Sequence, residues 1–138
     1  MEQLKQKNIT DHLYGVAETN PEKAAFLHPK KVSFGKLILE IDRYAEGFRA
    51  NGIGQGTRTI VLITPGVDLF AVTFALFRIG AIPVMIDPGM GLSRMVNALA
   101  GVKAEALVGI PRALLLRIFF PKKLGTIYSW FSTGFCWI

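Results

Sequence analysis

Residues 77–91 read Phe77-Arg78-Ile79-Gly80-Ala81-Ile82-Pro83-Val84-Met85-Ile86-Asp87-Pro88-Gly89-Met90-Gly91, and this stretch decides the fold class. It has the pattern of a helix end, a glycine turn, a buried strand over 82–86 and a Pro/Gly-rich loop. Ligands of open α/β sheets collect at the carboxyl ends of the strands. We therefore predict a ligand-binding loop made of Asp87, Pro88, Gly89, Met90 and Gly91.

Two interpretations of this loop stay open. Its glycines allow a ligand to approach the backbone closely, and free N–H groups at the start of the next helix can face an anion. Asp87, however, would repel a phosphate. The alternative is a turn that holds no ligand, which is the more common role of a glycine loop.

Strands and helices alternate from residue 59 onward. The pattern predicts strands over 59–64, 82–86 and 106–110, and helices over 68–79, 93–100 and 112–120. The strands read as covered on both faces, and helix 68–79 is apolar nearly all round, so we expect it to be largely buried. The predicted fold is α/β, with a mostly parallel sheet (β-α-β-α-β) and right-handed crossovers.

The first part of the chain has a different pattern. It predicts a helix from residue 8 or 10 to 20, a small β-hairpin over 24–34, and a second helix from 33 or 35 to about 51. A helix and a small β-hairpin therefore precede the predicted sheet.

Composition bounds the class of protein. The chain has 138 residues, 51% of them apolar and 19% charged, so it is one domain, or a piece of one, with a core to bury. The single cysteine, Cys136, excludes an internal disulfide and a cysteine cluster for zinc. The polar N-terminus lacks the apolar core of a signal peptide. The uncharged run 124–138 is shorter than the roughly 20 residues of a membrane-spanning helix. We expect a cytoplasmic protein, with peripheral membrane contact left open.

No catalytic residue and no metal ligand is predicted. The glycines of segment 52–56 follow a helix and precede a strand, which is the reverse of a dinucleotide fingerprint, so they indicate a helix stop and a turn. His12 and His28 lack the surroundings of a catalytic triad, and we expect them to be structural or solvated. Nothing in the spacing of Asp68 and Asp87 requires them to pair as acid and base.

The C-terminal end carries most of the net charge of +6. Segment 112–123 places basic side chains beside an apolar surface, so it is either a membrane-surface helix or, as we favour, a helix that packs on a core. The tail over 124–138 is aromatic and of uncertain origin, and we separate it from residues 1–123. Its aromatic residues are not mixed with basic ones, so no nucleic-acid binding is expected.

Several short segments resemble, in chain order, the motifs of the AMP-forming adenylating enzymes, the acyl-CoA synthetase and ligase superfamily. They are Asn20-Pro21-Glu22-Lys23-Ala24-Ala25, Val32-Ser33-Phe34-Gly35-Lys36-Leu37, Gly52-Ile53-Gly54-Gln55-Gly56-Thr57-Arg58-Thr59, in which Thr57 stands where the family usually has Asp, and Phe74-Ala75-Leu76-Phe77-Arg78-Ile79-Gly80-Ala81-Ile82-Pro83-Val84. The resemblance covers about residues 8–121. Segments 86–91 and 109–113 resemble one branch, the OleC type of olefin biosynthesis, which converts long-chain β-hydroxy acids into β-lactones with ATP.

This resemblance implies a fragment of an ATP-dependent, AMP-forming ligase that activates a long-chain acyl or β-hydroxy acid carboxylate as an acyl-adenylate. Residues 1–123 would be a partial N-terminal subdomain. Its partners would be a small-molecule acyl substrate and the missing C-terminal portion of the enzyme. The family uses ATP and Mg²⁺, but the chain lacks the Thr/Ser/Gly-rich phosphate loop with its lysine. We therefore expect that the fragment binds ATP and Mg²⁺ poorly and that it is inactive.

Two alternatives remain. One is a non-catalytic module that binds a membrane surface or a partner protein through its basic, aromatic C-terminal end. The other is a degenerate gene product without a function.

Overall fold

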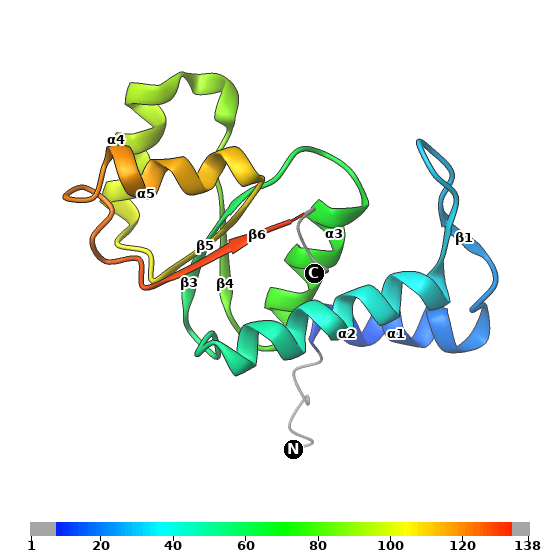
Figure 1. Ribbon diagram of the computed structural model, residues 1–138. Helices are drawn as coiled ribbons and strands as arrows, with labels where there is room; N and C mark the ends of the chain where they lie inside the picture. Colours follow the sequence, from blue (N-terminus) through cyan, green and yellow to red (C-terminus); the bar gives the residue numbers. More distant parts are fainter. Residues whose placement is uncertain (1–7, 134–138) are drawn as a thin grey trace, which may run out of the picture.

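A four-stranded sheet with helices on both faces forms the centre of the molecule (Figure 1). The structure is a computed structural model, and it describes residues 8–133. The strand order is β4-β3-β5-β6, and every neighbouring pair is parallel. The strands are β3 (Arg58–Leu62), β4 (Ile82–Met85), β5 (Ala106–Gly109) and β6 (Ser129–Ser132). The predicted α/β class with a mostly parallel sheet is confirmed.

The two inner strands carry the core on both faces. Consecutive residues of a strand point to opposite faces of the sheet. Val61 accordingly packs into the cluster on one face, and Ile60 and Leu62 pack into the cluster on the other. In β5, Val108 packs into the same cluster as Val61, and Leu107 packs into the same cluster as Ile60 and Leu62. This explains why both strands read as continuous apolar runs.

Three helices lie on one side of the sheet (Figure 1): α2 (Phe34–Ala50) and α3 (Val67–Arg78) pack in the core on that face, and α1 (Ile9–Thr19) packs against both of them. The Asn8 side chain caps α1 and, together with Asp11, completes a capping box. Ser33 caps α2. The buried residues of α2 recur at helical spacing, and they are Leu37, Ile41, Ala45 and Phe48. A small antiparallel hairpin, β1 (Ala24–Phe26) with β2 (Val32–Ser33), lies beyond these helices, as predicted.

The opposite face is covered by α4 (Leu92–Val102) and by the segment after β5. The helix predicted over 112–120 is a 3₁₀ turn, η2 (Pro111–Leu115), followed by one helical turn, α5 (Leu116–Phe119). Ala113 and Leu116 are buried against the sheet, so this segment packs on a core as we favoured. Ile118 and Phe119 on its outer side are exposed.

One expectation about burial is wrong. The strand predicted as buried over 82–86 is an edge strand, with Ile82 49% and Met85 55% exposed. Within residues 8–133, β4 pairs only with β3, so its outer side has no neighbour in the sheet. Helix α3 buries one face, with Ala71, Val72, Ala75 and Leu76, whereas Phe70 is 48% exposed.

The segment after residue 123 belongs to the core, which the sequence did not predict. Leu124 is 3% exposed and packs with Ile127 under the sheet. The fourth strand β6 follows, and its Phe131 ring meets the Phe48 ring edge-on at 5.3 Å between centroids. Residues 134–138, including Cys136, and residues 1–7 lie outside the described part. Between residues 8 and 133, no helix has both the length and the apolar character to cross a membrane.

Candidate functional site

The carboxyl edge of the sheet is divided by the course of the chain. Strand β3 continues into α3, which covers one face of the sheet, and β5 continues into η2, which covers the other. The two connections therefore leave neighbouring strands in opposite directions. A crevice opens at such a topological switch point, and ligands of open α/β folds bind there. Two pockets lie at this edge and share Ile63, Thr64 and Ile110.

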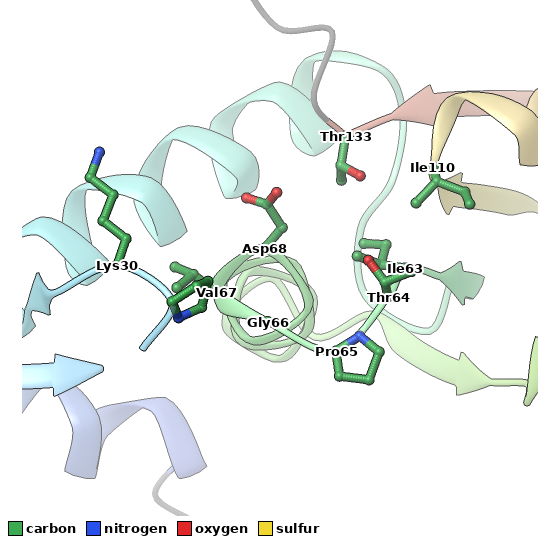
Figure 2. Close-up of a pocket in the computed structure, with 10 residues that line it drawn as sticks. Lys30, Ile63, Thr64, Pro65, Gly66, Val67, Asp68, Ile110 and Thr133 are labelled. Atoms are coloured by element: carbon green, nitrogen blue, oxygen red, sulfur yellow. The ribbon is translucent and has the colours of Figure 1, made fainter. Parts of the chain in front are cut away.

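The larger one, which we call the edge pocket, has a volume of about 400 Å³ (Figure 2). Thr64 comes from the β3–α3 connection and Asp68 from the first turn of α3, Ile110 follows β5, and Thr133 follows β6. Lys30, in the loop of the hairpin, borders the pocket from the other side. Loops from three neighbouring strands thus meet here.

The edge pocket is lined by both apolar and polar residues and carries charges of both signs. Thr133 is buried, and both its backbone N–H (2.9 Å) and its hydroxyl (3.5 Å) donate to the Gly109 carbonyl. Asp68 lies in the first turn of α3, where a carboxylate is favoured by the helix dipole. No group of three or more His, Cys, Asp or Glu side chains that could hold a metal ion occurs among the described residues.

The smaller one, which we call the apolar pocket, has a volume of about 220 Å³. Its walls come from three elements: Leu62 from β3, Leu92 and Met95 from α4, and Ala113 and Leu116 from the segment after β5. The two polar residues of its lining are Thr64 and Arg112. The apolar pocket thus lies on the α4 side of the switch point, whereas the edge pocket lies on the α3 side.

The predicted ligand loop lies at the carboxyl end of β4. Pro88–Met90 form a 3₁₀ turn, and the Asp87 carboxylate accepts a hydrogen bond from the Gly89 N–H at 2.7 Å. Gly91 has φ 88°, a conformation that favours glycine, and it is the N-cap of α4. Asp87, Gly89, Met90 and Gly91 are exposed, and none of these four residues lines either pocket. Their role as substrate-binding residues stays a prediction.

The other residues singled out from the sequence are dispersed. His12 and His28 are exposed. Asp68 borders the edge pocket, whereas Asp87 borders neither pocket, so the structure does not bring the two together at one site. The glycines over 52–56 form the turn between α2 and β3, as predicted.

Several lining residues were missed from the sequence, among them Lys30, Thr64, Arg112 and Thr133. Thr64 is the last residue of one predicted strand and Arg112 comes just after another, so the rule that ligands collect at carboxyl ends of strands points to them as much as to the loop after 86. Lys30 and Thr133 reach the site only through the hairpin and through β6, and no local signal marks them.

A polar cluster away from the pockets joins the three helices of one face. The Tyr14 hydroxyl donates to the Asp42 carboxylate, and the Arg78 guanidinium lies 4.0 Å from the centre of the Tyr14 ring. Arg78 also pairs with Asp42, at 3.4 Å between Nε and Oδ1. Burial and the hydrogen bond to Asp42 raise the pKa of the Tyr14 hydroxyl above its ordinary value. This cluster holds α1, α2 and α3 together.

Two olefin beta-lactone synthetases are similar to this chain in sequence. The olefin beta-lactone synthetase of Stenotrophomonas maltophilia strain K279a is 32% identical in an alignment 124 residues long, which covers 80% of this chain and 22% of that protein. The olefin beta-lactone synthetase of Xanthomonas campestris pv. campestris is 37% identical over 86 residues, 62% of this chain and 16% of the relative. The chain thus spans about a fifth of the length of these relatives.

The fold agrees with solved structures. The inhibitor-bound N-terminal domain of FACL13 from Mycobacterium tuberculosis superposes with a TM-score of 0.83 at 19% identity, over 92% of this chain and 33% of that one. A long-chain-fatty-acid-CoA ligase from Archaeoglobus fulgidus gives a TM-score of 0.80 at 24% identity, over 93% of this chain and 27% of that one. The family model described as AMP-binding enzyme matches residues 13–125, and the chain therefore belongs to the AMP-binding enzyme family.

Proposed function

We propose that the chain is the N-terminal part of an AMP-forming ligase that activates the carboxylate of a long-chain β-hydroxy acid, on the way to a β-lactone. The observation that carries this proposal is the similarity to two olefin beta-lactone synthetases, at 32% and 37% identity. The segments 86–91 and 109–113, which resemble the same branch, support it. Other relatives are named for other acids, such as the 2,3-dihydroxybenzoate–AMP ligase of Bacillus subtilis, at 37% identity over 81 residues.

In this proposal the chain supplies walls of the binding site and not the reacting groups. Nucleotidyl transfer needs positioned cations and a cradle for the phosphates. The donors of the edge pocket do not fit ATP with Mg²⁺, because its charged groups are one lysine, Lys30, and one carboxylate, Asp68. The chain by itself is therefore expected to form no acyl-adenylate.

A chimera tests the role in the ligase. Residues 13–125 of this chain replace the aligned segment of the Stenotrophomonas maltophilia enzyme, and pyrophosphate exchange into ATP is measured with a long-chain β-hydroxy acid. Exchange that depends on the acid supports the proposal. A matched control carries the aligned segment of the Bacillus subtilis ligase instead. A folded chimera without acid-dependent exchange would refute the proposal.

The purified 138-residue chain is assayed in parallel. No exchange is expected from it. Exchange that depends on ATP and on the acid would show that the chain carries the chemistry itself, against our proposal.

The alternative of a membrane- or partner-binding module gains no specific support from the C-terminal aromatic residues. Trp130 and Phe131 are part of β6 and pack against the two core clusters. The Lys123 ammonium group donates to the Asn97 side chain at 2.8 Å. Much of the apolar surface and one basic group of this end are thus used within the fold.

A further inference from the structure

We propose that the apolar pocket holds the alkyl chain of a carboxylic acid and that Arg112, at its rim, binds the carboxylate. The choice of an acid rests on the proposed function. The assignment of the ligand to this pocket, and of the anion contact to Arg112, rests on the geometry at the carboxyl edge of the sheet.

The walls of the pocket suit an alkyl chain. Seven of its nine lining residues are apolar, and the polar ones are Thr64 and Arg112. Apolar walls with few polar groups are typical of small-molecule sites, which mostly measure about 300–1,000 Å³. The apolar pocket, at about 220 Å³, falls below that range, so it suits a single chain better than a nucleotide. Met95 in its wall has an unbranched, adaptable side chain that can adjust to chains of different length.

The backbone fixes Arg112 at the rim. The Ile110 N–H donates to the Leu62 carbonyl at 3.0 Å, which ties the segment after β5 to β3. The Ala113 N–H donates to the Ile110 carbonyl at 2.8 Å, which closes the first turn of η2 around Arg112. The backbone of Arg112 is therefore held at the switch point, while its side chain is exposed.

The charge of Arg112 is unused within residues 8–133. The ion pairs of this part of the chain are Arg43–Glu40, Arg58–Glu105 and Arg78–Asp42. A guanidinium group presents two parallel N–H donors that match a carboxylate. An apolar pocket with one unpaired cation at its mouth is complementary to an amphiphile that has a single negative end.

Titration of the isotope-labelled 138-residue chain with decanoate below its micelle concentration tests this assignment by NMR. We expect shifts of the amide signals of Leu92, Met95 and Ala113, and binding at least tenfold tighter than that of acetate, because each buried methylene contributes about 0.8 kcal/mol. Arg112→Gln is expected to weaken decanoate binding about threefold to fivefold, the size of an exposed ion pair. Arg117→Gln removes the same charge five residues away, outside this pocket, and should leave the affinity unchanged.

A second variant narrows the pocket without touching the core. Leu92 lies at the first position of α4 and is exposed, so Leu92→Trp should fold, and it should weaken decanoate binding more than acetate binding. Equal affinities of Arg112→Gln and Arg117→Gln, or equal affinities for decanoate and acetate, would overturn the assignment. Shifts confined to other residues would also overturn it, because decanoate would then bind outside this pocket.

The two proposals fail separately. An active chimera combined with a chain that does not bind decanoate would leave the ligase role in place and remove the pocket assignment. An inactive, folded chimera combined with specific decanoate binding would do the reverse.

Discussion

Gly109 allows the chain to turn from β5 into η2, and replacing it with alanine should destabilise the protein. A Cβ atom at this position would lie 2.6 Å from the Ala113 Cβ, 3.2 Å from the Leu62 carbonyl oxygen and 3.3 Å from the Leu107 Cδ2. Carbon atoms in ordinary contact are about 3.5–4.0 Å apart, so η2 must move outward by roughly 1 Å. Two of these neighbours are buried core residues and one is backbone, which leaves little room for relaxation.

The expected cost follows from overpacking of a filled core, which typically destabilises by about 1–3 kcal/mol. Urea unfolding followed by circular dichroism measures it. With a slope of about 1–3 kcal/mol per molar urea for a small protein, the midpoint should fall by roughly 1 M. A double-mutant cycle with Ala113→Gly tests whether the clash with the Ala113 Cβ is the cause. Removing this atom from the Gly109→Ala variant should restore about 0.5–3 kcal/mol of the free energy of unfolding.

Gly47→Ala is the matched control. Gly47 is exposed within α2, and an added Cβ would have no heavy atom within 4 Å. The same chemical change should here stabilise by about 0.5–1 kcal/mol, because alanine favours the helix. If Gly109→Ala were as stable as the unchanged protein, the close approach of β5 and η2 would be refuted.

Three further substitutions probe other parts of the fold by the same unfolding assay. Tyr14→Phe removes the hydrogen bond to Asp42 and should cost about 1 kcal/mol. Because the pKa of Tyr14 is raised in the folded state, its contribution to stability is complete below its ordinary pKa of about 10 and decreases as the pH rises above that value. A stability difference between the two proteins that did not decrease at higher pH would contradict the cluster. Asn8→Ala removes the α1 cap and the 2.7 Å bond from its side chain to the Phe77 carbonyl, and should cost about 0.5–2 kcal/mol, whereas an unchanged midpoint would count against the capping box. Leu124→Ala opens a cavity under the sheet and should cost about 2–5 kcal/mol, and a cost near zero would place residues after 123 outside the core.

Local patterns were sufficient for helices α1 to α4 and for the inner strands, but not for segment 112–120. The caps at Asn8 and Ser33, the apolar stripe of α2 and the continuous apolar run of β3 each depend on neighbours within a few residues, and these elements form where the pattern predicts them. Their type is set by hydrogen bonding and burial that a short window already contains.

The place of a strand within the sheet depends on partners far away in the sequence. Segment 82–86 reads like an inner strand but forms the edge. Pro83 was an available signal, because a proline cannot donate to a strand ladder and is confined to edges, strand starts or bulges. Strand β6 has no such signal: Ser129–Ser132 mixes polar and aromatic residues, and only pairing with β5 makes it a strand.

The sequence predicted the edge of the sheet at which both pockets lie, but not the residues that line them. Both pockets lie at the carboxyl ends of strands. The strands that border the crevice are the two neighbours whose following connections go to opposite faces of the sheet. Which strands these are depends on the strand order β4-β3-β5-β6. The loop after β4 leaves an edge strand, whereas Thr64 and Arg112 follow the strands on either side of the switch point.

The strand order also bears on how the chain folds. Strand β3 is the first of the four strands in the sequence, yet it lies inside the sheet. Its residues pair with residues far away along the chain, for example Thr59 with Ala106. Such distant pairing is slow, because a long loop must close before any contact rewards it. During synthesis β3 is therefore made before either of its neighbours, and until α4 emerges its apolar residues have cover from the earlier helices on one face only. Chaperones that bind extended apolar segments would find their target here, in the nascent protein.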